Sequence, residues 1–427
     1  MESNHWELVV IKLGPESLVA FIGSMNCMPM AYAYALKKRG YSCVYFVDSP
    51  QSNTLCRPEC FYPELSYPYP DWVKEFIQRS QILVALFPRY FAYQYLKRIK
   101  KFFKRLPDCY VLNGYFVALG PYLPKGSKVV SLSHGSDLDV WANLAHAPRL
   151  YDSIRKRSIF PYLPSVLGLR VLKTVVRRQF KGFAQAHEVV YFPRGFSAMG
   201  DQVLDLLSKK STKFVPRYDI SFEVLEKPPV VKDIPGQPMR IFSGVRFAFK
   251  TFPDGDLGAA KGNDIIIAGL AKYFQRHNRN IQINFIEKGE DVAIAKSACS
   301  AAGLDPVVKW HQPMSFKELL GHYAGADVCF DQLGQHWIGQ GMFSMGLGIP
   351  LIANASAPVR CGLWPANNPI CNAVDSDQVC AWLVRLENKE FRDETGKRSR
   401  EFARQYFDAE STLRRIFDLE TGGKSRI

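Results

Sequence analysis

Two series of alternating strand-like and helical segments, separated by a proline-rich stretch, limit what this chain can fold into more than any other feature. The first series opens with an apolar run at residues 17–23, a helical pattern at 29–40 and a second apolar run at 43–48. Proline in its first turn and glycine at its end mark the bounds of the helix. Alternation of this kind predicts a parallel sheet with crossover helices, that is, a doubly wound α/β domain.

The same pattern continues along the chain and repeats in the second half. Further strands of the first series are predicted at residues 81–87, 109–119, 128–137 and 187–193. The second series predicts strands at residues 239–245, 281–287, 307–311, 327–333 and 349–354, and helices at 263–277, 293–303, 315–326 and 341–348. A chain of 427 residues is too long for one ordinary core, which also favours two domains.

The proline-rich text EVLEKPPVVKDIPGQP separates the two series and is unlike a regular element. We therefore predict two Rossmann-like domains, at residues 1–221 and 239–395, which face a cleft and are joined by a linker at 222–238. The amphipathic pattern at 396–427 predicts a C-terminal helix that packs back across the domain junction.

Composition and cysteine usage indicate a globular protein of the cytoplasm. Hydrophobic residues make up 47% of the chain, and the ten cysteines are scattered, several within apolar runs, as reduced cysteines are. The motif CRPEC at residues 56–60 lacks CxxC spacing, and no histidine–cysteine quartet with zinc spacing follows it, so we expect no metal site. The sequence shows no signal-peptide pattern and no apolar run of about 18 residues, the length that a membrane-spanning helix needs.

The formal net charge of +15 indicates an anionic partner or surface. Cations cluster at residues 97–105 and 149–181, mixed with apolar side chains at helical spacing, and the second cluster contains a single acidic residue, Asp152. Basic amphipathic helices of this kind are typical of an anionic membrane surface, so we expect peripheral association at the cytoplasmic face of the inner membrane. A solvated basic face is the plainer interpretation. Nucleic acid is not expected, because no nucleic-acid-binding motif accompanies the charge.

The stretch FDQLGQHWIGQGMFSMGLGIPLIA at residues 330–353 contains five glycines just after a predicted strand. Ligands of open parallel sheets bind where strands end and helices begin, and backbone amides without side chains there can hold phosphate. Two other predicted strands also end in glycine-bearing loops, GSMNCM and HGSDLD. A flexible loop is the alternative for the glycine-rich stretch.

Two cations follow the first strand of the second series. Arg246 lies in FSGVRFAFK, and Lys261 precedes a helix in AAKGNDIII. Together they could neutralise a departing diphosphate, which is electrostatic stabilisation of a leaving group. Lys250 is a rival for the lysine role, and exposed cations without function are the alternative for all three.

The second half then resembles a known family. The segments KGNDIIIAGLAKYF, INFIEKGED, VVKWHQPMSFKELLGHYAGADVCFDQ, GLGIPLIA and REFARQYFDAESTLRRIF follow, in this order, the C-terminal domain of group 1 retaining glycosyltransferases of the GT-B fold. The likeness covers residues 239–420, and SHGSD in the first half is similar to the loop that such enzymes place at the donor sugar. It implies a nucleotide-sugar in the C-terminal domain and an acceptor in the N-terminal one.

The resemblance also implies roles for individual residues. Arg246 and Lys261 would hold the diphosphate, although an insertion separates them here, and His134 would lie beside the transferred sugar. The donor-binding residues implied by the likeness are Gly23, Ser24, Gly135, Trp310, His311, Met314, Asp331, Gln332, Gln335, His336, Gly339 and Gly341. Gly23 and Ser24 would face the phosphates, residues 310–314 the nucleobase, and Gly339 and Gly341 the sugar or phosphate through their backbone.

The sequence departs from the family at an acidic pair. The family's usual pattern has glutamates at the positions held here by Gln335 and Phe343, the second of which grips the ribose. The clamp is therefore replaced or absent, and His336 is a nearby substitute, although a lone histidine is more often a packing or surface residue.

The leading hypothesis is a metal-independent, cofactor-independent retaining glycosyltransferase with a nucleotide-sugar donor and a glycan or polyprenyl-linked acceptor, acting in bacterial surface polysaccharide synthesis. The alternative is a non-catalytic nucleotide- or glycan-binding module on a transferase scaffold. A nucleic-acid binder is the third class, and it predicts strongly salt-dependent association.

Overall fold

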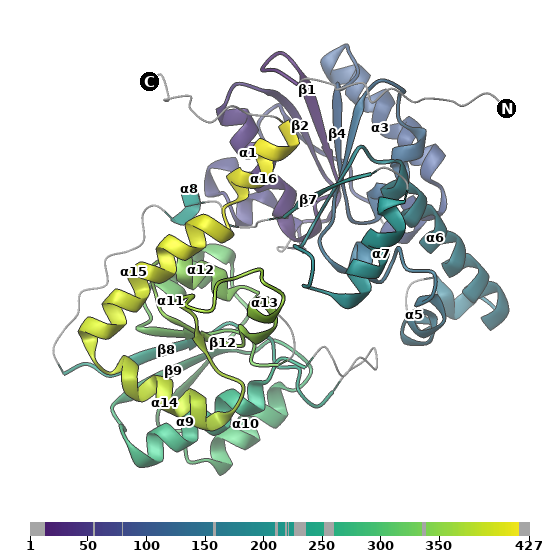
Figure 1. Cartoon of the computed structure of the whole chain (residues 1–427). Helices are drawn as coiled ribbons and strands as arrows, with labels where there is room; N and C mark the ends of the chain where they lie inside the picture. Colours follow the sequence, from purple (N-terminus) through teal and green to yellow (C-terminus); the bar gives the residue numbers. More distant parts are fainter. Residues whose placement is uncertain are drawn as a thin grey trace.

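The computed structural model describes residues 13–53, 56–78, 80–156, 159–209, 212–217, 220, 222–225, 236–251, 260–334 and 339–417. Its named strands form two parallel sheets, one of seven strands in the order β3-β2-β1-β4-β5-β6-β7 and one of six in the order β10-β9-β8-β11-β12-β13. Each sheet forms the centre of its own α/β unit (Figure 1). The predicted fold class, two doubly wound domains with a crossing C-terminal segment, is confirmed.

The first half of the chain supplies the seven-stranded sheet. Its strands are β1 (Leu18–Ile22), β2 (Ser42–Val47), β3 (Val73–Glu75), β4 (Cys109–Asn113), β5 (Lys128–Leu132), β6 (Glu188–Tyr191) and β7 (Lys213–Pro216). Its helices include α1 (Met28–Lys38), α2 (Gln81–Leu86), α3 (Pro88–Phe103), the 3-10 helix η5 (Gly114–Tyr122), α4 (Ser136–Asp139), α5 (Ala147–Ile154), α6 (Ser165–Gln185) and α7 (Ala198–Ser208). All five residues of β1 are buried, as in a strand covered on both faces.

The second half supplies the six-stranded sheet. Its strands are β8 (Met239–Ser243), β9 (Ile281–Ile286), β10 (Val308–His311), β11 (Val328–Phe330), β12 (Leu351–Ala353) and β13 (Cys371–Asn372). The helices are α9 (Asn263–Arg276), α10 (Val292–Ala301), α11 (Phe316–Ala324), α12 (Gly341–Gly346), α13 (Ser356–Arg360), α14 (Ser376–Leu386) and α15 (Lys389–Tyr406). Helices α9, α10 and α14 pack on one face, and α11, α12 and α15 on the other.

Two predicted strands of the first half differ in the structure. Of the strand predicted at 81–87, residues 81–86 form helix α2, and the strand between β2 and β4 in the sequence is the short β3. Residues 109–119 are a strand only to Asn113, after which the chain turns into η5. A short apolar run has the same periodicity in a buried strand as in a buried helix, and this ambiguity explains both errors.

The chain crosses between the domains twice. After β7, helix α8 (Phe222–Leu225) already packs on the six-stranded unit, where a methyl group at Gly346 would lie 2.5 Å from Leu225 Cδ1. At the other end, α15 packs against α12, and α16 (Ala409–Phe417) returns to the seven-stranded sheet. In Figure 1 the yellow α16 therefore lies beside the purple α1.

The two domains meet through segments that follow the carboxyl ends of strands. Phe61, which follows β2, packs with its ring 4.8 Å from that of Phe316, which follows β10. Gly195 follows β6, and a methyl group placed there would lie 2.9 Å from Cys361 Cβ, which follows β12. The carboxyl edges of the two sheets therefore face each other. Within the described ranges, every helix is too short or too polar to span a bilayer.

Candidate functional site at the facing strand ends

The glycine loop after β1 is occupied by contacts within the N-terminal domain. Gly23 has φ +99°, and a methyl group there would lie 2.3 Å from Asn113 O, so glycine lets the ends of β1 and β4 approach each other. The amide and hydroxyl of Ser24 both donate to Asp48 Oδ1, the amide over 2.8 Å. A phosphate would have to displace Asp48 to bind Ser24.

The SHGSD loop after β5 is organised by one buried carboxylate. Asp137 Oδ1 accepts hydrogen bonds from Ser133 Oγ (2.7 Å), His134 N (2.8 Å) and Gly135 N (2.9 Å). Gly135 has φ +127°, a conformation that other residues rarely adopt, and a methyl group there would lie 3.3 Å from the Phe192 ring. These contacts fix the backbone position of His134.

The His134 ring is held in its neutral form. Burial, and next the charge of Arg217, lower the pKa of His134 to about 3. Its Nε2 contacts Asn26 Nδ2, while its Nδ1 is buried and has no hydrogen-bond partner among the described residues. Arg217 is itself buried, and its Nη1 donates to Ser133 O over 2.6 Å. His134 can therefore exchange hydrogen bonds at neutral pH, but it is a poor proton donor.

A second carboxylate lies near this loop. Burial, together with the charge of Asp137, raises the pKa of Asp139 to about 6, and burial also raises the pKa of Asp137. Asp139 Oδ2 accepts from Tyr191 OH over 3.2 Å. Asp137 Oδ2 and Asp139 Oδ1 are buried without a hydrogen-bond partner among the described residues, so the loop has unused acceptor capacity.

In the C-terminal domain, Arg246 follows β8 and is half-exposed. It forms a loose ion pair with Glu290, with 3.9 Å between Nη1 and Oε1. Lys288 follows the neighbouring strand β9, and its pKa is lowered by burial and then by the charge of Arg246. Two cations from adjacent strand ends thus lie close together at this edge.

The loop after Arg246 is anchored by Asp291, which is fully buried. Its carboxylate accepts from the amides of Phe249 (2.7 Å), Lys250 (2.7 Å) and Thr251 (3.0 Å). Burial alone would raise the pKa of Asp291, but hydrogen bonds from Thr251 and these amides lower the pKa to about 2. Lys250 is thereby held on an exposed loop.

Lys261 lies against the glycine-rich loop. Its Nζ donates to Gln332 Oε1 over 2.9 Å, and its backbone O accepts from Leu333 N over 2.9 Å. Its backbone N donates to Ala248 O over 2.8 Å, which brings Lys261 close to the loop that carries Arg246 despite the inserted residues. Both predicted diphosphate ligands therefore belong to one edge of the sheet.

The glycines of the loop make room for Asp331. The amides of Gly339 and Gly341 both donate to Asp331 Oδ2, the second over 3.0 Å. A methyl group at Gly341 would lie 2.7 Å from Asp331 Cβ, and one at Gly339 would lie 2.8 Å from Gln332 Nε2. Burial raises the pKa of Asp331 to about 6 against the opposing effect of these amides. A ligand would have to displace Asp331 to use the two amides.

The predicted nucleobase residues point in different directions. Trp310 packs with Phe247 and Phe285 on one face of β10. His311 lies on the other face, where its Nε2 contacts Asn284 Oδ1 at 2.9 Å and its ring lies 4.5 Å from His322. Met314 is partly buried and packs against the core cluster that includes residues of α11 and α12. Strand alternation separates Trp310 from His311, so these two side chains cannot line one binding surface.

Of the two positions of the altered acidic pair, the structure describes only Phe343. Gln335 and His336 lie outside the described residues. Phe343, on α12, packs with its ring 5.0 Å from Phe316, which in turn contacts Phe61 of the other domain. A chain of three aromatic rings thus occupies the junction at the position where the family that the sequence resembles has a ribose-binding glutamate.

Sequence reasoning missed Lys288, Arg217 and Asp137 as parts of this edge. Lys288 follows a predicted strand directly, so the rule that sites lie at strand carboxyl ends could have found it. Asp137 lies within the quoted SHGSD motif. Arg217 follows β7, a strand that the apolar pattern did not reveal because its first residue is exposed and two others are only half-buried.

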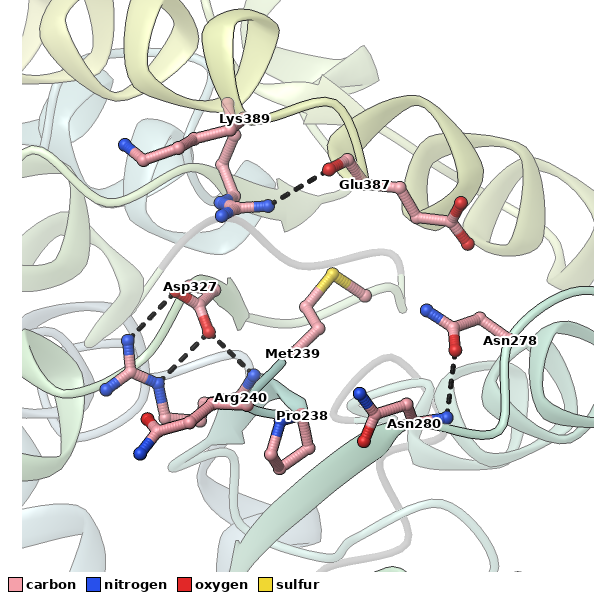
Figure 2. Close-up of a pocket in the computed structure, with 10 residues that line it drawn as sticks. Pro238, Met239, Arg240, Asn278, Asn280, Asp327, Glu387 and Lys389 are labelled. Atoms are coloured by element: carbon pink, nitrogen blue, oxygen red, sulfur yellow. Dashed lines mark hydrogen bonds and ion pairs between the residues drawn. The ribbon is translucent and has the colours of Figure 1, made fainter. Parts of the chain in front are cut away.

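Two hollows lie in the C-terminal domain, and the first lies away from this edge. Figure 2 shows one of about 390 Å³ at the amino end of β8, beside the ion pair of Arg240 with Asp327. The other, of about 470 Å³, lies between α11 and the face of β9 and β10, and His311 and His322 line it. In the described part of the chain, no group of three His, Cys, Asp or Glu is placed to hold a metal ion.

Comparison with known proteins gives matches in structure and none in sequence. No protein-family model and no curated protein matches this chain. Sucrose-phosphate synthase from Thermosynechococcus elongatus is 12% identical with a TM-score of 0.61, covering 94% of this chain and 98% of its own. A glycosyltransferase from Rickettsia africae is 12% identical with a TM-score of 0.59, and the match covers 94% of this chain and 97% of the Rickettsia chain. The Anabaena protein HepE, in complex with UDP and glucose, is 12% identical with a TM-score of 0.58, and the match covers 94% of this chain and 99% of the HepE chain. The chain therefore has the GT-B fold, as the sequence resemblance predicted.

Proposed function

We propose that this protein is a glycosyltransferase whose C-terminal domain binds a nucleotide-sugar and whose N-terminal domain binds the acceptor. The observation that carries the proposal is the positive edge of the six-stranded sheet, where Arg246, Lys261 and Lys288 lie on loops around the glycine-rich loop. This edge faces the N-terminal domain, whose own strand ends carry His134. The fold neighbours described as a glycosyltransferase and as a complex with UDP and glucose support this class of donor.

In this proposal the cations stabilise the diphosphate as it leaves. Arg246 and Lys261 match the negative charge of a nucleoside diphosphate, and Lys288 adds to the local positive potential. Because these side chains supply the charge, the reaction is proposed to need no metal and no cofactor. The neutral His134 ring accepts or donates a hydrogen bond to a sugar hydroxyl beside the reacting carbon.

The finer parts of the proposal come from the sequence resemblance. We expect retention of the anomeric configuration, with the leaving phosphate acting as base on the same face of the sugar. The acceptor is a glycan or a polyprenyl-linked glycan, as in the synthesis of bacterial surface polysaccharides. Closure of the two domains excludes water and favours transfer over hydrolysis.

Calorimetry with UDP and GDP tests the donor site directly. Arg246→Ala and Lys261→Ala should each weaken binding of the preferred nucleotide by about tenfold, because each removes a charge-assisted contact to phosphate. Arg276→Ala is the matched control, since Arg276 is an exposed cation at the far end of α9. The proposal fails if neither nucleotide binds, or if the control weakens binding as much as the other two variants.

A binding module without transfer activity is the second candidate, and Phe343 is the observation that favours it. Its ring packs against Phe316 and provides no group that could bind ribose hydroxyls. The two candidates differ in turnover: a transferase releases UDP or GDP from a bound nucleotide-sugar, by transfer or slow hydrolysis, whereas a module binds the nucleotide-sugar and leaves it intact.

A further inference from the structure

Helices α5 and α6 form a projection with its own small core. They are inserted between β5 and β6, and Leu150, Tyr151 and Phe160 pack there against Leu172 and Val176 of α6. The helices also meet closely, because a methyl group at Gly168 would lie 2.4 Å from Tyr151 OH. In Figure 1 the two helices extend from the side of the N-terminal domain. The projection is therefore a packed element that holds its surface in a fixed shape.

The tip of this projection exposes large apolar side chains to solvent. Tyr162 is 87% exposed, Val166 78% and Leu167 43%; Val166 and Leu167 lie in the first turn of α6, and Tyr162 ends the 3-10 helix Phe160–Tyr162 just before it. Isolated exposed apolar residues are ordinary, but adjacent ones at the tip of a rigid hairpin mark an interaction surface.

Cations precede and follow these apolar residues along α5 and α6. Arg149, Arg155, Lys156 and Arg170 are all exposed, and in the described part of the chain none of them forms an ion pair. Asp152 is the single acidic residue between positions 149 and 181. The tip thus combines an apolar centre with an uncompensated positive rim. Residues 157 and 158 lie outside the described residues and play no part in the argument.

The tip lies at the same edge as the candidate site. As a crossover helix between parallel strands, α6 runs antiparallel to them, so its first residues lie at the carboxyl edge that carries His134. Its 21 residues span about 31 Å, whereas the five residues of β5 span about 17 Å. The start of α6 therefore extends beyond the strand ends, toward the side on which the acceptor would bind.

We infer that the α5–α6 tip docks on an anionic phospholipid bilayer, with Tyr162, Val166 and Leu167 entering the interface and the surrounding arginines and lysine contacting headgroup phosphates. A bilayer is the occupant that uses both features, since apolar side chains lose water-exposed area there and cations meet a negative surface. A nucleic acid would use the cations but offers no apolar layer for Val166 and Leu167. The inference deepens the proposed function, because it places the acceptor side of the molecule next to a lipid-linked acceptor.

Vesicle flotation of the full chain tests the inference. The probes are phosphatidylcholine vesicles with and without phosphatidylglycerol, and we expect binding only with the anionic lipid. The variant Arg149→Gln/Arg155→Gln/Arg170→Gln should bind on the order of 100-fold more weakly, from about fivefold per cation. The variant Tyr162→Ser/Val166→Ser/Leu167→Ser should also bind vesicles at least about tenfold more weakly, since it removes the apolar area that docking would bury.

A control with equal loss of charge separates docking at the tip from general attraction. Lys100, Lys101 and Lys104 are exposed cations at the end of α3, which lies at the opposite edge of the sheet. Changing these three to glutamine should leave vesicle binding within about threefold of the unaltered protein. Hydrogen–deuterium exchange of the unaltered protein gives a second readout that needs no variant: residues 159–170 should exchange more slowly with anionic vesicles.

Three results would overturn the inference: equal binding to neutral and anionic vesicles, an equal effect of the α3 control, or no added protection at residues 159–170. Binding to single-stranded RNA that the serine variant leaves intact, without binding to vesicles, would assign the surface to nucleic acid instead. Calorimetry with UDP and GDP needs no vesicles, so failure of membrane docking can be told apart from failure of the proposed transferase function.

Discussion

Asp291 and Asp331 are two buried aspartates at strand ends of one domain, and replacing each by asparagine should affect stability differently: only the change at Asp291 should destabilise the protein. A pKa of about 2 for Asp291, against the ordinary 3.8, corresponds to about 2.5 kcal/mol in favour of its ionised form in the folded protein. The carboxylate accepts the amides of residues 249–251, and an asparagine NH₂ group would point donors at donors. Asp291→Asn should therefore destabilise the C-terminal domain by about 2–3 kcal/mol at pH 7.

The pKa of Asp331 is shifted in the opposite direction from that of Asp291. Its pKa is raised to about 6, so the folded protein disfavours the ionised carboxylate by up to about 3 kcal/mol. An asparagine oxygen can still accept the amides of Gly339 and Gly341 without carrying the buried charge. Asp331→Asn should therefore leave stability unchanged or raise it at pH 8.

The pH dependence of the two variants distinguishes this reasoning from a general effect of substitution. The stabilisation by Asp291 is complete above about pH 4 and is lost as pH falls through about 2, so the deficit of Asp291→Asn should shrink in acid. The contribution of Asp331 is present below about pH 4 and is lost as pH rises through about 6, so any gain from Asp331→Asn should grow between pH 4 and pH 8.

Calorimetric melting with local hydrogen exchange measures both effects. A loss of 2–3 kcal/mol lowers the melting temperature of a domain of this size by about 5–10 °C. The amides of Phe249, Lys250 and Thr251 should lose exchange protection in Asp291→Asn and keep it in Asp331→Asn. The reasoning is refuted if the two variants melt at the same temperature at pH 7, or if the deficit of Asp291→Asn stays constant down to pH 2.5.

Three further outcomes are expected. Gly341→Ala should cost about 1–3 kcal/mol in urea unfolding, because its methyl group would lie 2.7 Å from Asp331 Cβ; an unchanged midpoint would mean that α12 shifts freely. The His134 ring should remain neutral in NMR spectra from pH 5 to pH 8, since burial and then Arg217 lower its pKa to about 3, and a titration in that range would contradict the described contacts. Phe61→Ala should remove a contact between the domains and raise the radius of gyration in X-ray scattering, and an equal radius would show that the ring does not hold the domains together.

The sequence was most informative where apolar runs are bounded by clear turn residues. The first strand was predicted at residues 17–23 and forms β1 (Leu18–Ile22), and the helix predicted at 263–277 forms α9 (Asn263–Arg276). In both cases the period, the length and the flanking residues indicate the same element. In the run at 81–87 these signals do not agree, and residues 81–86 form helix α2 instead of the predicted strand.

For the site, the sequence predicted which loops reach the edge but not what their polar groups bind. The motif SHGSD indicated a ligand at His134, whereas the loop is first organised around Asp137. The glycine-rich loop was predicted to offer its amides to phosphate, and the structure pairs two of them with Asp331. Hydrogen bonds between residues of one loop depend on backbone dihedral angles, which residue types and spacing alone do not determine.

The return of α16 to the first sheet has a consequence for how this protein is made. Leu413, Ile416 and Phe417 cover apolar residues of the seven-stranded sheet, and Tyr41 contacts the Phe417 ring at 6.2 Å between centroids. The ribosome adds these residues only after the strands of both sheets, so the N-terminal unit keeps one apolar face uncovered until residues 409–417 emerge and pack on it. A recombinant fragment that stops before the linker would retain that open face, and joining residues 409–417 to it through a short tether should restore its solubility.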